Sequence, residues 1–154
     1  MVNHFYFDTS ALVKNYITET GSHWVQSALR SDQTVVLTSS LTSIEGVCAF
    51  ARRLREKLLS EDDLTQLCAL FRYDFLHRYS VLVVDHLVLN KAQQLALLHP
   101  LRAYDAVHLA TASLVQQRLT RAGEPPLVFV CADERLLAFA QAEGMLFENP
   151  NCHP

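Results

Sequence analysis

Short apolar runs alternate with helical patterns along the whole chain, and this alternation restricts the possible folds more than any other feature. The runs span residues 4–7, 35–38, 81–84, 127–131 and 145–147. Between them, apolar side chains recur at the three- and four-residue spacing of helices. Strands that alternate with helices predict a mostly parallel sheet with helices on both faces, because right-handed crossovers carry the chain across each face. We therefore expect an α/β fold, a three-layer α/β/α sandwich around a mostly parallel central sheet.

Capping side chains mark where several helices should begin. Asp8 starts a polar triplet, Asp-Thr-Ser, ahead of a helix through residues 11–14, and Asp85 precedes a helix over 87–98. Ser60 and Asp63 form a capping box, with aspartate in place of the usual glutamate, ahead of a helix that runs to about residue 78. Further helices are predicted over 23–29, 45–58, 103–119 and 134–142, the last ending at Gly144.

Size and composition predict one domain over residues 1–154. Half of the residues are apolar, and the net charge of −3 leaves no general attraction for polyanions, so nucleic-acid binding would need a local basic patch. Cys48, Cys68 and Cys131 lie in apolar stretches without CxxC spacing, which predicts reduced, packed thiols. No uncharged apolar stretch reaches about 18 residues, so we expect no membrane partner and a cytoplasmic location.

Four acidic residues lie in segments that otherwise look built for burial: Asp8, Glu45, Asp105 and Asp133. A carboxylate near a core is costly unless it is paired or binds a cation. Asp8 and Asp133 directly follow predicted strands, and Glu45 lies within two helical turns of another, so these three should converge on one edge of the sheet. Two interpretations stay open. The four share a divalent metal, or Asp8 and Asp133 are ordinary helix N-caps while the others face solvent or bond locally.

The residues around these positions resemble the four motifs of PIN-domain ribonucleases. Residues 7–14, Phe-Asp-Thr-Ser-Ala-Leu-Val-Lys, are similar to the opening motif, and residues 40–45 resemble the second acidic segment. Residues 102–112, Arg-Ala-Tyr-Asp-Ala-Val-His-Leu-Ala-Thr-Ala, carry the most specific match, and residues 129–136 resemble the fourth motif. The order is that of the family, and the resemblance covers nearly the whole chain. Among its members, chains of this size look most like the VapC toxins of prokaryotic toxin–antitoxin pairs.

That resemblance implies a PIN-like fold and an endoribonuclease that uses Mg²⁺ or Mn²⁺ and a metal-activated water to hydrolyse RNA phosphodiester bonds. Asp8 and Asp105 would be the principal metal ligands, and Glu45 and Asp133 would complete the catalytic pocket. Ser10 matches a small hydroxyl residue of the first motif and would bond within the site. The family implies two protein partners as well: a VapB-type antitoxin that places a basic side chain in the pocket, and a second copy in a homodimer.

One departure from the family pattern lies next to the fourth carboxylate. Cys131-Ala132 stands where a threonine or serine is common, which removes one hydroxyl and makes Asp133 the least certain ligand.

Basic residues near the acidic motifs are candidates for substrate contacts. Arg52 and Arg55, spaced to lie on one side of a helix, would bind backbone phosphates, unless they belong to a plain solvated face. Lys14 would reach a substrate phosphate or else be an ordinary exposed lysine. His108, three residues after Asp105, is expected to be a buried structural residue rather than a ligand.

Two other functions compete with the nuclease. A phosphatase would use Asp8 as a nucleophile, yet such enzymes commonly carry a second aspartate two residues on, where this chain has Ser10. A non-catalytic binding module on a PIN fold is the other alternative. Histidine spacing typical of zinc sites and glycine-rich nucleotide loops are both missing from the sequence. The RNA target and the choice between Mg²⁺ and Mn²⁺ stay open.

Overall fold

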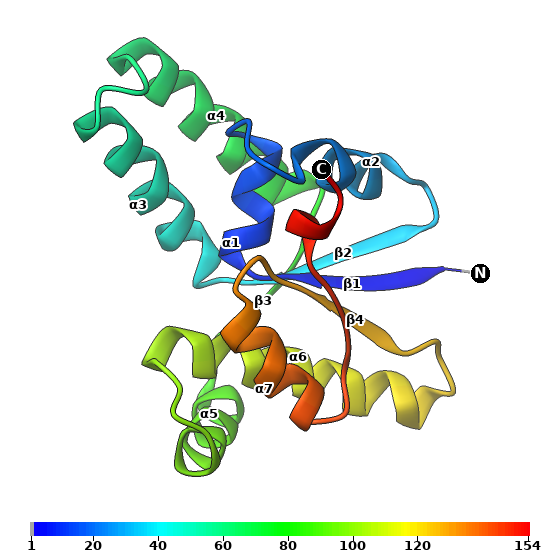
Figure 1. Ribbon diagram of the computed structural model, residues 1–154. Coiled ribbons are helices and arrows are strands. Elements are labelled where there is room, and N and C mark those ends of the chain that lie inside the picture. Colours follow the sequence, from blue (N-terminus) through cyan, green and yellow to red (C-terminus); the bar gives the residue numbers. More distant parts are fainter. Residues whose placement is uncertain (1) are drawn as a thin grey trace.

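A parallel sheet lies between two layers of helices in the computed structural model, which describes residues 2–154 (Figure 1). The sheet of this part of the chain has five strands in the order β3-β2-β1-β4-β5, and every neighbouring pair is parallel. The strands are β1 (Asn3–Phe7), β2 (Thr34–Ser39), β3 (Ser80–Leu82), β4 (Leu127–Val130) and β5 (Leu146–Glu148). The central β1 pairs Phe5 with Val36 on one side and with Val128 on the other. The predicted three-layer α/β/α sandwich is confirmed.

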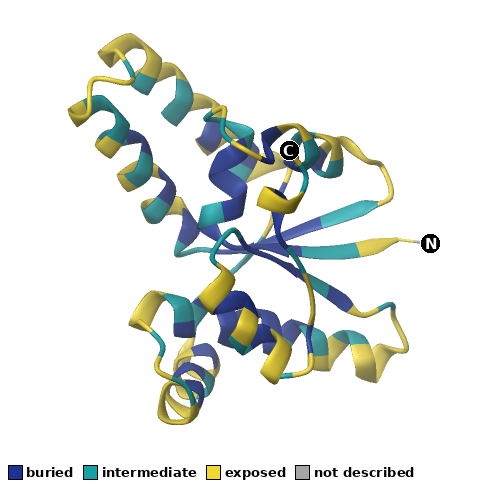
Figure 2. Cartoon of the chain, in the orientation of Figure 1, coloured by how far each residue is buried: buried dark blue, intermediate teal, exposed yellow. Residues whose placement is uncertain are grey.

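Helices cover both faces of the sheet (Figure 1). One layer contains α1 (Thr9–Leu12), α2 (Ser22–Arg30), α3 (Thr42–Arg55) and α4 (Glu61–His77), with the short 3-10 turn η1 (Val13–Asn15). The other layer contains α5 (His86–Leu98), α6 (Ala103–Ala122) and α7 (Glu134–Ala142). Helices α3 and α4 form an arm that extends beyond the sheet, and its far end is mostly exposed (Figure 2).

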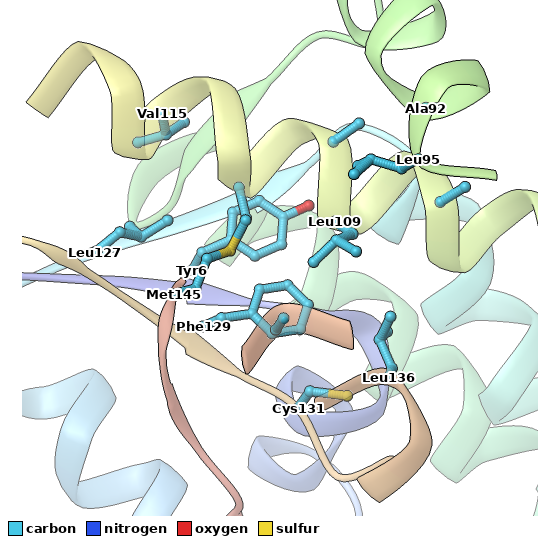
Figure 3. Packing of buried hydrophobic residues seen from close by; sticks show 14 of the residues in the cluster. Tyr6, Ala92, Leu95, Leu109, Val115, Leu127, Phe129, Cys131, Leu136 and Met145 are labelled. Carbon is cyan, nitrogen blue, oxygen red and sulfur yellow. The ribbon is translucent and has the colours of Figure 1, made fainter. Parts of the chain in front are cut away.

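The core is divided by the sheet into two apolar clusters. Tyr6 packs on one face, where it stacks on Phe129 at 5.6 Å between ring centroids and lies in one cluster with Leu109 of α6 (Figure 3). Phe7, the next residue, packs on the opposite face with Phe50 and the α3–α4 pair. This alternation is the two-residue period of a strand. Because both faces are covered, β1 and β4 read as continuous apolar runs.

The C-terminal segment folds back onto the α2 layer. Its 3-10 turn η2 (Pro150–Cys152) had no counterpart among the predicted elements. Gly21 has φ +83°, and a Cβ there would lie 2.2 Å from the Pro150 carbonyl oxygen, so only glycine fits. The Trp24 ring stacks on His153 at 4.9 Å, which holds the end of the chain against α2.

The cysteines differ in how far they are buried. The three thiols predicted to be reduced are free. Cys131 is buried as predicted and Cys68 is partly buried, but Cys48 is exposed, because its position on α3 faces outward rather than into the core. No helix within residues 2–154 is long and apolar enough to cross a membrane.

Candidate functional site

The four acidic residues lie at the carboxyl edge of the sheet. Asp8 follows β1 and caps α1, Asp133 follows β4 and caps α7, and Glu45 is in the first turn of α3, which follows β2. Because these three strands are parallel neighbours, their carboxyl ends meet, as the sequence predicted. Asp105 reaches the same edge because α6 begins there before it runs back to the start of β4.

Asp8 is buried, with 5% of its surface exposed. Its Oδ1 accepts hydrogen bonds from the Ala11 amide at 3.0 Å and from the Ser10 hydroxyl at 2.7 Å. Burial raises the pKa of Asp8 above its ordinary value, although His108 and these hydrogen bonds act in the opposite direction. Ser10 in turn accepts from the Ala132 amide at 2.9 Å, so it joins the loop after β1 to the loop after β4.

Asp105 and Asp133 influence each other across the start of α6 and α7. Burial raises the pKa of Asp105, and the negative charge of Asp133 raises it further. The Arg135 guanidinium lies 3.6 Å from the Asp105 carboxylate and acts in the opposite direction. Asp133 uses its Oδ1 to accept from the Arg135 amide at 2.9 Å, so it is a helix N-cap, but this leaves its other oxygen free for a second role.

Cys131 occupies the place where a hydroxyl was expected. It is fully buried, and its Sγ lies 3.6 Å from the Ser10 hydroxyl and 3.2 Å from the Asp133 amide, which donates to it. Burial, and next the charge of Asp8, raises the pKa of this thiol far above its ordinary value. The sulfur is therefore a neutral packing group between the first and fourth motifs.

Glu45 is hydrogen-bonded to His108, a buried residue that no local sequence pattern links to it. The Glu45 Oε1 accepts from the His108 Nε2 at 2.7 Å, although the two residues are 63 apart in the sequence. His108 is 2% exposed, in agreement with the prediction of a buried residue, and its Nδ1 lies 2.9 Å from the Tyr6 hydroxyl. The only sequence signal was the three-residue spacing from Asp105 to His108, which places both on similar sides of α6.

An open groove of about 580 Å³ passes the acidic edge. It is lined by acidic, hydroxyl, apolar and basic side chains, among them Ser10, Ile44, Glu45, Arg52, Arg55, Arg102 and Tyr104. The structure therefore places both predicted arginines of α3 in one groove with Ser10 and Glu45. Arg102 and the exposed Tyr104 come from the start of α6, within the third motif, but no feature of the sequence marked them as groove residues.

Lys14 lies elsewhere. Its side chain is buried, and Nζ donates to the Glu19 carboxylate at 3.2 Å and to the Thr20 carbonyl at 2.9 Å. The ammonium group is therefore occupied inside the protein, and it is neither an exposed lysine nor a residue that lines the groove. Arg53 also pairs with Glu19, and it reaches Glu56 at 3.8 Å, the helix pair that its spacing allows.

The carboxylates do not come together as a ligand cluster. Within residues 2–154, no group of three or more His, Cys, Asp or Glu side chains is arranged to hold a metal ion. Like charges repel, and the acidic residues instead take protein partners: serine, histidine, arginine and backbone amides. Their donor chemistry nevertheless fits Mg²⁺ or Mn²⁺, since all four supply oxygens. Two of them, Asp8 and Asp105, have raised pKa values, so a nearby cation would relieve the cost of their charge.

Comparison with known proteins assigns the family. The model of the family described as PIN domain matches residues 5–141. The chain belongs to the PIN domain family. Ribonuclease VapC45 of Mycobacterium tuberculosis is 37% identical to this PIN domain over 139 residues, which are 90% of each chain.

Solved structures share the fold of this PIN domain. VapBC2 from Rickettsia felis, bound to a DNA fragment from its promoter, has a TM-score of 0.63 at 11% sequence identity. The match covers 95% of this chain and 98% of the chain in that structure. VapC20 from Mycobacterium tuberculosis, described as a sarcin–ricin loop cleaving toxin, has a TM-score of 0.61 at 16% identity, with coverages of 87% and 93%.

Proposed function

We propose that residues 1–154 form one PIN-like domain that acts as an endoribonuclease, the toxin of a toxin–antitoxin pair. The observation that carries this proposal is the groove in which Ser10 and Glu45, at the acidic edge, lie with Arg52, Arg55 and Arg102. A metal-dependent nuclease uses both: cationic groups that bind the phosphate backbone and carboxylates that hold the metal at the scissile bond. The name of the relative that shares 37% identity, Ribonuclease VapC45, supports the same reaction.

The basic side chains would bind the RNA backbone. Arg52 and Arg55 present two guanidinium groups from α3, and Arg102 faces the groove from the start of α6. Such contacts hold a nucleic acid in register without reading its sequence. Tyr104, 61% exposed beside Asp105, offers an aromatic face on which one base of a single strand would stack.

The carboxylates would hold the divalent cation. Asp8 and Asp105 are proposed as the main ligands of Mg²⁺ or Mn²⁺, with Glu45 and Asp133 in support. Such an ion, when bound, polarises a phosphoryl oxygen and lowers the pKa of a water. The protein's part is to hold the donors in place: Ser10 fixes the Asp8 carboxylate, and the Asp133 side chain is fixed by the first turn of α7.

RNA cleavage by purified protein tests the proposal. The wild-type chain, Asp8→Ala and Asp105→Ala would be incubated with total RNA and Mg²⁺ or Mn²⁺, and cut sites would be mapped by primer extension. We expect discrete cuts with the wild type and at least a hundredfold slower cleavage with either variant, a scale typical for the loss of a group that acts directly in catalysis. Undiminished cleavage and growth inhibition in both variants would favour a binding module instead.

A phosphatase that uses Asp8 is the second enzyme to exclude. Here the Ser10 hydroxyl donates to the Asp8 carboxylate, in the place where a second acid would stand. The proposal expects no phosphoenzyme on Asp8 when the protein is incubated with phosphomonoesters and analysed by mass spectrometry. A trapped phosphoaspartate would revive the phosphatase.

The proposed protein partners are a VapB-type antitoxin and a second copy of the chain. The antitoxin would place a basic side chain in the acidic pocket. VapBC2 from Rickettsia felis, which has the same fold, was solved bound to a DNA fragment from its promoter. Co-expression with the neighbouring small open reading frame should yield a complex that lacks RNA cleavage. Multi-angle light scattering of the free chain would measure whether it is a homodimer.

A further inference from the structure

We propose that His108, anchored by Tyr6, positions the Glu45 carboxylate in the groove and is a positioning residue of the proposed nuclease site. This inference rests on the proposed function, because the role of Glu45 is itself proposed. His108 lies behind the acidic edge, and its own surface is almost completely inaccessible.

A chain of hydrogen bonds joins three separate elements at this point. The Tyr6 hydroxyl of β1 lies 2.9 Å from His108 Nδ1 on α6, and His108 Nε2 lies 2.7 Å from Glu45 Oε1 on α3. A carboxylate can only accept, so Nε2 carries the hydrogen and donates to Glu45. Nδ1 is paired with the Tyr6 hydroxyl at the other end of the ring, so both ring nitrogens have a partner.

The hydrogen-bond chain is buried at its Tyr6 end and open to the groove at its Glu45 end. Tyr6 is fully buried between Phe129 and α6, and its hydroxyl points away from the sheet (Figure 3). His108 is 2% exposed, and Thr9 lies beside its Nε2 at 3.4 Å. Glu45, in contrast, has 23% of its side chain exposed and lines the groove. A glutamate at a helix surface samples several rotamers, and this contact selects one of them.

The contact also links the two helix layers, because it joins α6 to α3. Asp105 and His108 are on the same helix, whereas Glu45 belongs to α3 on the other side of the sheet. His108 therefore fixes one carboxylate relative to the other, across a site whose acidic groups otherwise repel. The contact uses one oxygen of Glu45, so the second oxygen can serve a ligand. Side chains that orient metal ligands in this way typically contribute 10- to 100-fold in metal affinity or activity.

Two substitutions of His108 test the contacts of its two ring nitrogens separately. In His108→Gln, the amide nitrogen can take the place of Nε2 and still donate to Glu45. In His108→Asn, the shorter amide falls near Nδ1, so it keeps the Tyr6 contact and loses Glu45. His99→Asn is the control, because His99 Nε2 lies at the same distance, 2.7 Å, from Glu143 Oε1, in a pair that is more exposed at its histidine and is not part of the groove.

The experiment measures Mn²⁺ affinity by titration calorimetry with MnCl₂ alone, and kcat and KM for cleavage of RNA at the mapped site. We expect His108→Asn to lose 10- to 100-fold in Mn²⁺ affinity and kcat with little change in KM. His108→Gln should retain most of both, and His99→Asn should match the wild type. Tyr6→Phe, which leaves the ring without its anchor, should cost roughly fivefold.

The outcomes separate this inference from the proposed function. A wild type that neither cleaves RNA nor binds Mn²⁺ overturns the proposed function, and the inference falls with it. An active wild type with His108→Asn equal to it overturns the inference alone. Equal losses in His108→Asn and His108→Gln would show a packing role only and would also overturn it. If His108→Asn does not fold, Tyr6→Phe and His108→Gln decide by the same measurements.

Discussion

Replacement of Gly46 by alanine should force α3 away from α4. Gly46 follows Glu45 directly and is buried against the ring of Phe71. A Cβ added to Gly46 would lie 2.5 Å from Phe71 Cζ and 2.8 Å from Cε1, closer than carbon atoms approach in folded proteins. The glycine is therefore required by the approach of the two helices, since its own backbone is ordinary helix.

The cost depends on whether Phe71 can move, and its neighbours hold it. The ring is 2% exposed and lies edge-on to Phe50 at 5.4 Å and to Tyr16 at 5.1 Å. Overpacking of such a core costs about 1–3 kcal/mol. Alanine's better helix propensity offsets about 1 kcal/mol of this. We expect Gly46→Ala to lower the free energy of unfolding by about 1 kcal/mol, the middle of a range of about 0–2 kcal/mol, and the melting temperature by about 2–4 °C.

A double-mutant cycle in urea tests this reasoning. Gly46→Ala, Phe71→Leu and the double variant would be unfolded with the wild type, and the four free energies compared. Phe71→Leu makes room for the new methyl group, so the double variant should be more stable than the separate losses predict, with a coupling of about 0.5–3 kcal/mol. A Gly46→Ala protein at least as stable as the wild type would refute the argument, and so would strictly additive losses.

Two further predictions concern charged side chains: the buried Asp8 and the arginines of the groove. Burial raises the pKa of Asp8 from 3.8, so the folded chain binds a proton on this carboxyl group more tightly than the unfolded chain does. The free energy of unfolding therefore falls as the pH rises from the pKa of Asp8 in the unfolded chain to its pKa in the folded chain. The slope is at most about 1.4 kcal/mol per pH unit. Asp8→Asn, which keeps a capping side chain, should therefore be more stable than the wild type in EDTA at pH 7.5, and urea unfolding should show that advantage vanish near pH 4. Lower stability of the variant at pH 7.5 would contradict this. The double variant Arg52→Gln/Arg55→Gln should weaken RNA binding and reduce the slope of log affinity against log salt by about 1.4, or about 0.7 for each lost contact. Fluorescence anisotropy would measure it, with Arg118→Gln/Arg121→Gln, an exposed pair of equal spacing at the other end of α6, as the unaffected control.

Local features of the sequence predicted most of the helices and strands, because the contacts that begin and end them are short-range. The capping box of Ser60 and Asp63 is present, with hydrogen bonds in both directions, and Asp85 caps α5 through the Val88 amide. The predicted bounds of the last helix, 134–142, agree with α7. The third helix was predicted to run to residue 58, but it ends at Arg55, because the backbone at Lys57 turns to φ +61°.

The sequence by itself determined the layered parallel fold and the acidic edge. Apolar runs that alternate with amphipathic helices allow few other arrangements, and parallel strands bring residues that follow them to one edge. Asp8, Glu45 and Asp133 could be placed there for that reason alone.

Only the tertiary structure decided what each of these side chains touches. Glu45 and His108 are 63 residues apart, and Lys14 takes its partners from a loop whose path no periodicity predicts. Side chains pair according to the packing of helices across the sheet, and this packing depends on the shapes of many distant residues at once. The sequence could therefore name the carboxylates and two arginines of the site, but the contact of His108 with Glu45 and the place of Arg102 in the groove required the folded chain.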